Sequence, residues 1–255
     1  MVRLSRTKEL DRLGVTEPAS VSTSREPQKI AGMFDGIARR YDTLNHVLSG
    51  GLDLVWRRRA IRALAMPPGA RLLDMCTGTG DLALAALRGS APAADVVGID
   101  FSGEMLRHAL IKVHAAGLGA RIRLVRGDAT RVPLPDQSVD AASVAFGIRN
   151  VVDRDRACRE FCRVLKPGGR LAVLEFGNPT MPGWKQLYRW YSSAVLPRIG
   201  AAISGDRVAY AYLPASISQF PEPPQFADAL RAAGFSKVEW KAQTFGTVYL
   251  YIATK

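Results

Sequence analysis

The sequence of 255 residues has few cysteines and no long apolar run. Three cysteines, Cys76, Cys158 and Cys162, are too few for a disulfide framework. Cys158 and Cys162 share one face of an expected helix without a histidine pair nearby, so we interpret them as core residues and predict no metal site. No stretch approaches the roughly 18 apolar residues of a membrane-spanning helix. The basic N-terminus lacks the apolar segment of a signal peptide, and together these absences predict a cytoplasmic chain.

The charge balance is strongly basic, with 35 Lys and Arg against 23 Asp and Glu and a formal net charge of +12. Such a balance favours an anionic partner, namely nucleic acid, an anionic membrane surface or an acidic ligand. Many of these charges are scattered along expected helices, however, which is also typical of an ordinary solvated face. The apolar content of 47% is that of a globular protein.

The chain divides into a polar arm and one folded domain. Residues 1–28 are rich in Ser, Pro and charge, and we interpret them as a flexible arm. The domain is expected over residues 29–255, with a helical cap at 29–66 and an aromatic-rich helical insert at 178–220. Two helices are predicted within the insert, at about Gly183–Ile199 and Asp206–Gln219.

Between and after these segments, apolar strands alternate regularly with amphipathic helices. This alternation predicts an α/β protein with a Rossmann-like, seven-stranded, mostly parallel sheet, helices on both faces and an antiparallel last strand. A helix over Arg154–Leu165 is expected to stop at the following Lys-Pro-Gly-Gly. The expected strands are Arg71–Met75, Ala94–Asp100, Arg121–Arg126, Val139–Phe146, Arg170–Phe176, Val238–Gln243 and Val248–Thr254.

The stretch Arg71–Asp81 combines a strand, a glycine-rich turn and the start of a helix. Gly78 and Gly80 permit a tight turn and a close approach of the backbone to a ligand. Asp100 ends the second strand 22 residues after Gly78, where a carboxylate accepts hydrogen bonds from ribose hydroxyls. These features alone are compatible with NAD.

Asp74 distinguishes between the two candidate cofactors. It ends the first strand beside the loop, where a carboxylate repels a pyrophosphate and attracts an ammonium or a sulfonium. S-adenosylmethionine carries both cations and no phosphate. Asp128 and Ala129 follow the third strand and are expected beside the adenine, although Asp128 is also compatible with a simple turn residue. The pattern therefore favours S-adenosylmethionine over NAD.

Further motifs identify a family. From about residue 30 to 255 the chain resembles the C-methyltransferases of ubiquinone and menaquinone biosynthesis, within the S-adenosylmethionine-dependent Rossmann-like methyltransferases. The most specific pieces are Tyr-Asp-x-x-Asn at Tyr41–Asn45 and Phe-Gly-x-Arg-Asn-Val at Phe146–Val151. The supporting pieces are Leu48–Gly51, Trp56–Arg58, Leu73–Leu82, Leu165–Leu171, Leu174–Phe176, Tyr210–Leu213, Ser216–Ile217, Phe220–Pro221 and Ala233–Phe235.

The resemblance implies a set of cofactor contacts. The family places contacts at the positions of Thr79, Asp100, Asp128 and Ala129, and a serine where this chain has Ala145. A hydroxyl contact is therefore lost or moved here, and His46 departs from an aspartate that is common in the family. The full expected set of cofactor-binding residues is Asp74, Gly78, Thr79, Gly80, Asp100, Phe101, Asp128, Ala129 and Ala145.

The resemblance also implies a reduced, prenylated quinone as substrate, methylated on a ring carbon. Such a carbon becomes nucleophilic when the neighbouring hydroxyl ionises, and Arg149 is our candidate to stabilise the phenolate. Asn150 is expected to fix the ring, and Asp42 or His46 to act as base, although a surface or capping histidine is the favoured interpretation of His46. The expected substrate-contacting residues are Tyr41, Asn45 and Phe146.

Demethylmenaquinol is the preferred substrate, with the ubiquinone precursor as an additional or alternative one. The rival interpretations are an RNA methyltransferase, which lacks a recognition domain here, an NAD-dependent oxidoreductase, which Asp74 disfavours, and a non-catalytic binding module. We expect no nucleic-acid partner, entry of the prenyl tail at the aromatic insert, and peripheral contact with the anionic inner face of the membrane. The oligomeric state stays open, with a homodimer as one expectation.

Overall fold

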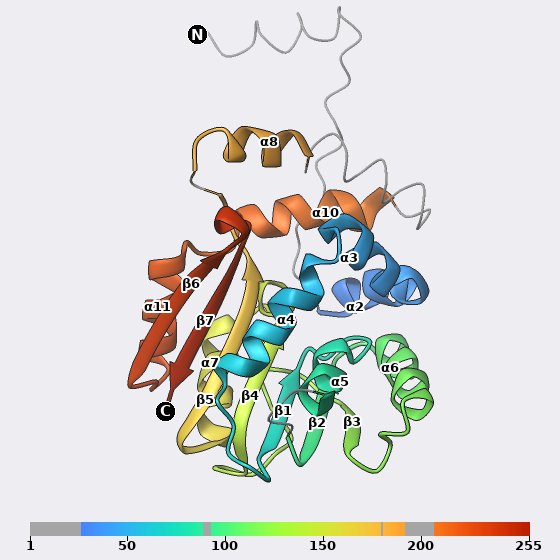
Figure 1. Ribbon diagram of the computed structural model, residues 1–255, viewed down its shortest axis with the longest axis vertical. Helices are drawn as coiled ribbons and strands as arrows, with labels where there is room; N and C mark the ends of the chain where they lie inside the picture. The colour runs from blue at the N-terminus through green and yellow to red at the C-terminus, as the bar shows by residue number, and fades with distance from the viewer. Residues whose placement is uncertain (1–26, 89–92, 180, 192–206) are drawn as a thin grey trace, which may run out of the picture.

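The computed structural model describes residues 27–88, 93–179, 181–191 and 207–255. A seven-stranded sheet in the order β3-β2-β1-β4-β5-β7-β6 forms its centre (Figure 1). The first five strands are parallel, whereas β7 runs antiparallel between β5 and β6. This confirms the predicted mostly parallel sheet with an antiparallel last strand. The strands are β1 (Arg71–Met75), β2 (Asp95–Asp100), β3 (Ile122–Arg126), β4 (Val139–Ala145), β5 (Leu165–Phe176), β6 (Lys237–Gln243) and β7 (Val248–Thr254).

Successive residues of β1 pack into two different hydrophobic clusters, because side chains alternate across a strand. Leu72 contributes to the cluster beneath α4 (Leu52–Ala63) and α5 (Asp81–Arg88). Leu73 contributes to the cluster beneath α7 (Arg154–Val164) and α11 (Pro223–Ala232). Both faces of the sheet are therefore covered, as expected for parallel strands. α6 (Gly103–Ala115) completes the first layer, placing Val113 in that cluster.

The remaining helices lie across the carboxyl ends of the parallel strands (Figure 1). The expected cap consists of α2 (Pro27–Ile37), η1 (Ala38–Arg40), α3 (Tyr41–Ser49) and α4. Gly50 and Gly51, both at positive φ, separate α3 from α4. The insert contributes α8 (Trp184–Trp190) and α10 (Arg207–Ser218), and the short helices η2 (Ile148–Asn150) and η4 (Thr244–Gly246) complete the fold.

Two boundaries differ from the sequence prediction by more than one residue. β5 begins at Leu165 rather than at Arg170, because Leu165 pairs with Val139 and a bulge absorbs the Pro-Gly-Gly segment before the ladder resumes at Arg170. The first described helix begins at Pro27, within the stretch predicted as an arm. The rest of that arm, and the end of the helix predicted over Gly183–Ile199, lie outside the described residues.

Candidate active site

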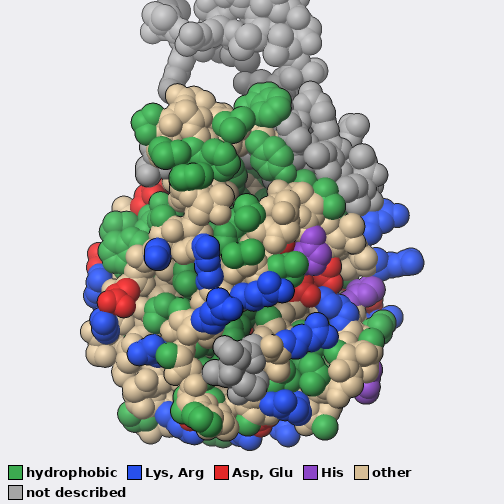
Figure 2. Space-filling model, in the orientation of Figure 1, with side chains coloured by type: hydrophobic (Ala, Val, Ile, Leu, Met, Phe, Trp, Pro, Cys, Tyr) green, Lys and Arg blue, Asp and Glu red, His purple; other side chains and the backbone are tan. Residues whose placement is uncertain are grey.

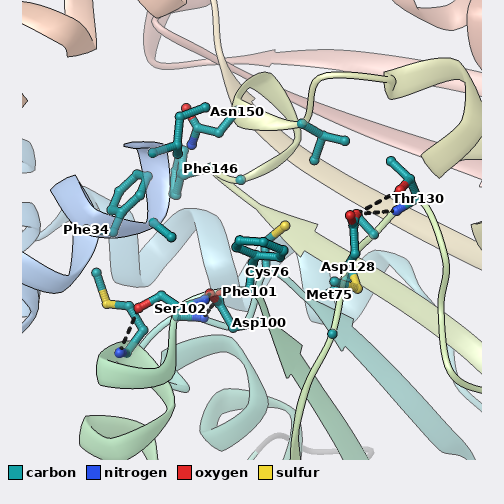
Figure 3. Close-up of a pocket in the computed structure, with 18 of the residues that line it drawn as sticks. Phe34, Met75, Cys76, Asp100, Phe101, Ser102, Asp128, Thr130, Phe146 and Asn150 are labelled. Atoms are coloured by element: carbon teal, nitrogen blue, oxygen red, sulfur yellow. Dashed lines mark hydrogen bonds between the residues drawn. The ribbon is translucent and has the colours of Figure 1, made fainter. Parts of the chain in front are cut away.

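A cavity of about 250 Å³ lies at the carboxyl ends of β1, β2 and β4. In this sheet the strand order reverses between β1 and β4, and open α/β sheets bind ligands at such a switch point. Figure 3 shows Asp100, Phe101 and Asp128 along one side of the cavity, with Phe34 of α2 and Phe146 opposite them. The cap therefore helps to enclose the site.

The glycine-rich loop after β1 forms one wall of this cavity. Gly78 lies at φ +57°, lines the cavity and donates its backbone N–H to Oδ2 of Asp100 at 2.8 Å. Gly80 lies at φ +84°, and a Cβ there would come within 3.3 Å of Cβ of Ala109 in α6. Both positions therefore require glycine for backbone conformation, and Gly80 also for the close packing of the loop on a helix.

Asp100 ends β2 with its two oxygens held in separate backbone hydrogen bonds. Oδ2 accepts from Gly78, and Oδ1 accepts from the N–H of Ser102 at 2.9 Å. Burial raises the pKa of this carboxyl, while the two backbone donors act against the rise. Each carboxylate oxygen has further lone pairs, so Asp100 is oriented to accept hydrogen bonds from two neighbouring hydroxyls. The structure therefore gives this predicted ribose contact a suitable geometry.

Asp128 and its neighbours form the far side of the same cavity. Oδ1 of Asp128 accepts from the N–H and the hydroxyl of Thr130, at 2.8 and 2.9 Å. Ala129, Phe101 and Ala145 also line the cavity, as predicted for contacts with a nucleoside. The bonds from Thr130 orient the Asp128 carboxylate, so the turn interpretation and the binding interpretation are compatible.

Asp74 does not lie where the sequence interpretation placed it. It is buried behind the loop, is absent from the cavity lining, and accepts hydrogen bonds from Thr77 at 2.6 Å and Ser143 at 2.8 Å. Burial raises its pKa to about 6, and the two hydroxyl bonds oppose that rise. The expected direct contact of Asp74 with the cofactor therefore stays a prediction. Asp74 anchors the loop, because its carboxylate is hydrogen bonded to Thr77 of the loop and to Ser143 of β4.

Thr79 and Asp42 are hydrogen bonded to each other, outside the lining of the cavities. The hydroxyl of Thr79 donates to Asp42, whose second oxygen accepts from Lys112 of α6 at 2.6 Å. Neither Thr79 nor Asp42 lines any of the described cavities. A general-base role for Asp42 is therefore not supported, because its carboxylate lies outside the lining of these cavities. The carboxylate instead fastens α3 of the cap to the glycine-rich loop.

Phe146 separates the first cavity from two smaller ones beneath the cap and insert, of about 80 and 50 Å³. It lies at φ +58°, with its ring 4.6 Å from that of Phe176. A Cβ on the next residue, Gly147, would lie 2.3 Å from Cβ of Cys76, so the two loops touch here. Phe146 therefore forms a shared wall between a cofactor-sized space and an aromatic-lined one.

Arg149 lies in the 50 Å³ cavity as half of a buried ion pair. Its guanidinium donates to Oε1 of Glu175 at 2.8 Å and to the carbonyl of Phe146, while its backbone N–H donates to Oε2 of Glu175. The two side chains are 5% and 0% exposed. The Nε of Arg149 has no hydrogen-bond partner among the described residues. A buried donor without a partner stabilises an anionic oxygen brought next to it.

Polar side chains from three elements surround Arg149. Tyr41 and Asn45 of α3 are hydrogen bonded to each other and line the same cavity, as does Tyr212 of α10. The Tyr212 hydroxyl donates to the side-chain oxygen of Asn150 at 3.1 Å. Burial raises the pKa of Tyr41, so its phenol stays protonated and remains a donor. The predicted substrate residues thus lie together.

Several residues that line the cavities, or that hold lining residues in place, were absent from the prediction. Phe34 and Ile30 line the large cavity from α2, and Glu175 and Tyr212 hold Arg149 and Asn150. Glu175 could have been found, because an acid within an apolar strand needs a buried cation. The α2 residues carry no such signal, since apolar residues on an amphipathic helix usually face a core.

The chain is similar to known proteins over most of its length. A sequence model of the ubiE/COQ5 methyltransferase family matches residues 22–255. The chain is 48% identical over 227 residues to the "Ubiquinone/menaquinone biosynthesis C-methyltransferase UbiE" of Syntrophotalea carbinolica, covering 89% of this chain and 94% of that protein. It is 46% identical over 223 residues to the "Demethylmenaquinone methyltransferase" of Thermus thermophilus, covering 88% and 100%.

Solved structures share the fold at low identity. The "[4+2]-Cyclase SpnF" has a TM-score of 0.67 at 21% identity, covering 89% of this chain and 95% of that chain. A "SAM-dependent methyltransferase, possible histamine N-methyltransferase" from Thermotoga maritima has a TM-score of 0.62 at 19% identity, covering 88% and 99%. This fold therefore serves different reactions, and the site and the sequence relatives must identify the chemistry.

Proposed function

The chain belongs to the ubiE/COQ5 methyltransferase family, and from that premise we propose that it converts demethylmenaquinol to menaquinol. It is an S-adenosylmethionine-dependent C-methyltransferase of quinone biosynthesis. The proposal concerns which hydroquinone is methylated and how the described residues handle it. C-methylation of the ubiquinone precursor, additionally or instead, is the second candidate, because relatives such as that of Syntrophotalea carbinolica carry both quinones in their names.

The residues that line the 250 Å³ cavity fit S-adenosylmethionine in their chemistry. Gly78 leaves room for a close approach, Asp100 offers two oriented oxygens to a ribose, and Asp128 with Ala129 and Phe101 offers an adenine site. When bound there, S-adenosylmethionine supplies an activated methyl group on a sulfonium. The residues of the chain therefore have to position the acceptor ring, favour its phenolate and remove the ring proton.

The position of Phe146 is the observation that best supports the proposal. Its side chain borders the cofactor-sized cavity and both aromatic-lined cavities, so a ring bound beyond it lies next to the cofactor space. Water is excluded by Phe176, Leu48 and Leu213, which line both smaller cavities. Burial in such a site strengthens the attraction between the Arg149 guanidinium and a phenolate. Asn45 and Tyr41 supply further donors for the ring oxygens.

The proposal is tested with purified protein, S-adenosylmethionine and three acceptors. We expect methyl incorporation into reduced demethylmenaquinone, with bulk RNA as a negative control. A prenylated precursor of ubiquinone distinguishes the two candidate quinones. Exclusive methylation of that precursor would replace the demethylmenaquinol proposal with the second candidate, and methylation of neither quinol would overturn both.

Asp42 provides a prediction that separates positioning from catalysis. The Asp42→Ala variant loses two partly buried hydrogen bonds that join α3 to Thr79 and Lys112. Hydrogen bonds to charged groups contribute about 1.5–3 kcal/mol, so we expect binding of S-adenosylhomocysteine to weaken by about 10-fold or more. The kcat should fall much less, and calorimetry with steady-state kinetics checks this. An unchanged affinity combined with a collapsed kcat would instead restore Asp42 as the base.

The partner that delivers the substrate is proposed to be an anionic membrane. Among the described helices, none is long and apolar enough to cross a bilayer. Leu187 and Trp190 of α8 are 50% and 59% exposed, while Tyr188 of the same helix lines the 80 Å³ cavity. Apolar side chains gather at the α8 end of the molecule, and a row of Lys and Arg crosses the same face (Figure 2). Apolar insertion and charge attraction together support peripheral binding near the entry of the prenyl tail.

Vesicle flotation tests this partner. The protein should float with vesicles containing anionic phospholipid and should not float with neutral ones. Leu187→Asp with Trp190→Asp, and separately Arg58→Glu with Arg62→Glu on exposed positions of α4, should each reduce flotation. Each basic residue near an anionic surface contributes about 1 kcal/mol, so reversing two charges should weaken binding by at least about 30-fold. Equal flotation of all variants would contradict the proposal.

A further inference from the structure

A compact polar cluster joins α3 to α4 beside the aromatic-lined cavity. Asp53 is its centre: Oδ2 accepts from Arg57 at 2.5 Å and lies 2.8 Å from Nδ1 of His46, while Oδ1 accepts from the hydroxyl of Ser49 at 2.9 Å. The Asp53 side chain is 3% exposed, whereas that of His46 is 37% exposed. The pair therefore connects a buried carboxylate directly to solvent.

The cluster also borders the space assigned to the substrate ring. Asp53 and Arg57 line the 80 Å³ cavity together with Phe146. The guanidinium carbon of Arg57 lies 5.4 Å from the centre of the Phe146 ring. Among the described residues that line the two cavities beyond Phe146, Asp53 is the sole carboxylate. A proton leaving a ring in this space therefore has one acid side chain within the lining to receive it.

Other groups near the ring are unsuited to receive that proton. Asp42 lies outside the lining and is held by Thr79 and Lys112. Glu175 is fully buried against Arg149 and does not line either cavity. Burial raises the pKa of Tyr41, and raises that of Tyr188 to about 12, so both phenols stay protonated and are poor bases.

Resting on the proposed function, we infer that Asp53 is the base that takes the ring proton and that His46 passes it to solvent. Formation of the new carbon–carbon bond, with cleavage of the bond from sulfur to methyl, leaves a tetrahedral ring carbon bearing both the methyl and the hydrogen. The electron pair of that C–H bond returns to the ring, and the proton moves to Asp53. Once protonated, Asp53 donates to Nδ1 of the His46 tautomer that carries its hydrogen on Nε2. That Nε2 hydrogen then leaves to water, which returns the pair to an Nδ1–H that donates to the ionised carboxylate.

A weak base suffices for this step because the ring regains aromaticity as the proton leaves. Arg57 donates to one oxygen of the Asp53 carboxylate at 2.5 Å, and the hydroxyl of Ser49 holds the second oxygen in place at 2.9 Å. A carboxylate oxygen of Asp81 lies within 4.8 Å of a ring nitrogen of His46 and of a carboxylate oxygen of Asp53. Lys112 forms an ion pair with Asp81. Asp53 is thus the catalytic residue of this pair, and His46 acts through it.

The test of Asp53 uses quinol deuterated at the reacting ring carbon. In the unchanged protein, proton removal should follow methyl transfer rapidly and show little isotope effect. Asp53→Asn should slow turnover by about 100-fold or more and make the deuterated quinol react several-fold slower than the protonated one. Asp53→Glu should restore part of the rate and suppress the isotope effect. A slowed Asp53→Asn variant without any isotope effect would overturn the assignment.

His46 supplies a second test that does not depend on a buried substitution. His46→Ala should lose activity, and added imidazole should restore it because the position is open to solvent. His114→Ala, an exposed histidine on α6, should show neither loss nor rescue. Calorimetry with S-adenosylhomocysteine should give unchanged affinity in all these variants. Loss without rescue would overturn the relay, whereas failure of the unchanged protein to methylate any quinol would overturn the proposed function instead.

Discussion

Replacing Arg149 by Met and Glu175 by Gln in one variant is expected to abolish methyl transfer in a folded protein that still binds S-adenosylhomocysteine. Arg149 carries a buried Nε without a partner at the cavity that also contains Tyr41 and Asn45. Loss of one donor to a developing oxyanion costs about 100- to 1,000-fold in kcat. Radiolabelled methyl transfer to the quinol measures the loss, and calorimetry measures the retained affinity.

The double substitution is needed because Arg149 alone cannot be removed cleanly. Glu175 is 0% exposed, and the Arg149→Ala variant would leave its charge without a partner in the core. Breaking a buried ion pair in this way costs about 3–5 kcal/mol of folding free energy, enough to unfold a marginally stable domain. Removing both charges together avoids that penalty, so the remaining effect reports on the reaction.

A control ion pair, more exposed than that of Arg149 and Glu175, is available on α7. Arg163 and Glu160 form an ion pair on α7, outside the lining of the described cavities. Arg163→Met with Glu160→Gln should leave turnover unchanged after correction for any loss of stability. Normal turnover by the folded Arg149 and Glu175 double variant would contradict the role of this pair in the reaction.

Local patterns in the sequence were sufficient for most of the fold. β1 ends at Met75 and β7 spans Val248–Thr254, as predicted, because apolar strands bounded by glycine and charge are recognisable without tertiary information. The start of β5 at Leu165 could not be predicted in this way. It depends on a pairing with Val139 that requires a bulge in the neighbouring ladder.

The candidate site was predicted in its residues but not in the directions of its side chains. Asp100 and Asp128 line the cavity as expected, whereas Asp74 turns to Thr77 and Ser143 behind the loop. Asp74 is the last but one residue of β1, Asp100 ends β2 and Asp128 follows β3, so the sequence pattern treats them alike. The difference arises from hydroxyl donors on neighbouring elements, whose positions depend on the assembled sheet.

Long-range ion pairs explain the remaining differences. Arg149 was predicted to face the substrate, with a structural ion pair as the alternative; it lines the cavity, and its guanidinium is also shared with Glu175, 26 residues later in the chain. Asp42 was predicted as a base, yet Lys112, 70 residues later, occupies one of its oxygens. Charge complementarity makes such pairs plausible in retrospect, but 35 basic and 23 acidic residues allow too many combinations for the sequence to select them.

Asp100 carries the second large expected effect. Asp100→Ala removes two oriented acceptors for the ribose and leaves the N–H groups of Gly78 and Ser102 without their carboxylate. At about 1.5–3 kcal/mol for each hydrogen bond to a charged group, loss of two ribose contacts weakens S-adenosylhomocysteine binding by at least about 100-fold. Calorimetry measures the affinity. Asp95→Ala, at the opposite end of β2 in an exposed ion pair with Arg71, is the matched control and should bind normally.

The same carboxylate gives a pH dependence whose direction follows from its burial. Burial raises the pKa of Asp100, and only the ionised form offers four acceptor sites. Affinity for S-adenosylhomocysteine should therefore fall as the pH decreases through that raised pKa, at a higher pH than for an ordinary aspartate. Asp74, with a pKa raised to about 6, titrates behind the loop in the same direction. Asp74→Asn should keep this decrease in affinity, and Asp100→Asn should remove it. The reverse pattern would show that the ribose contact does not belong to Asp100.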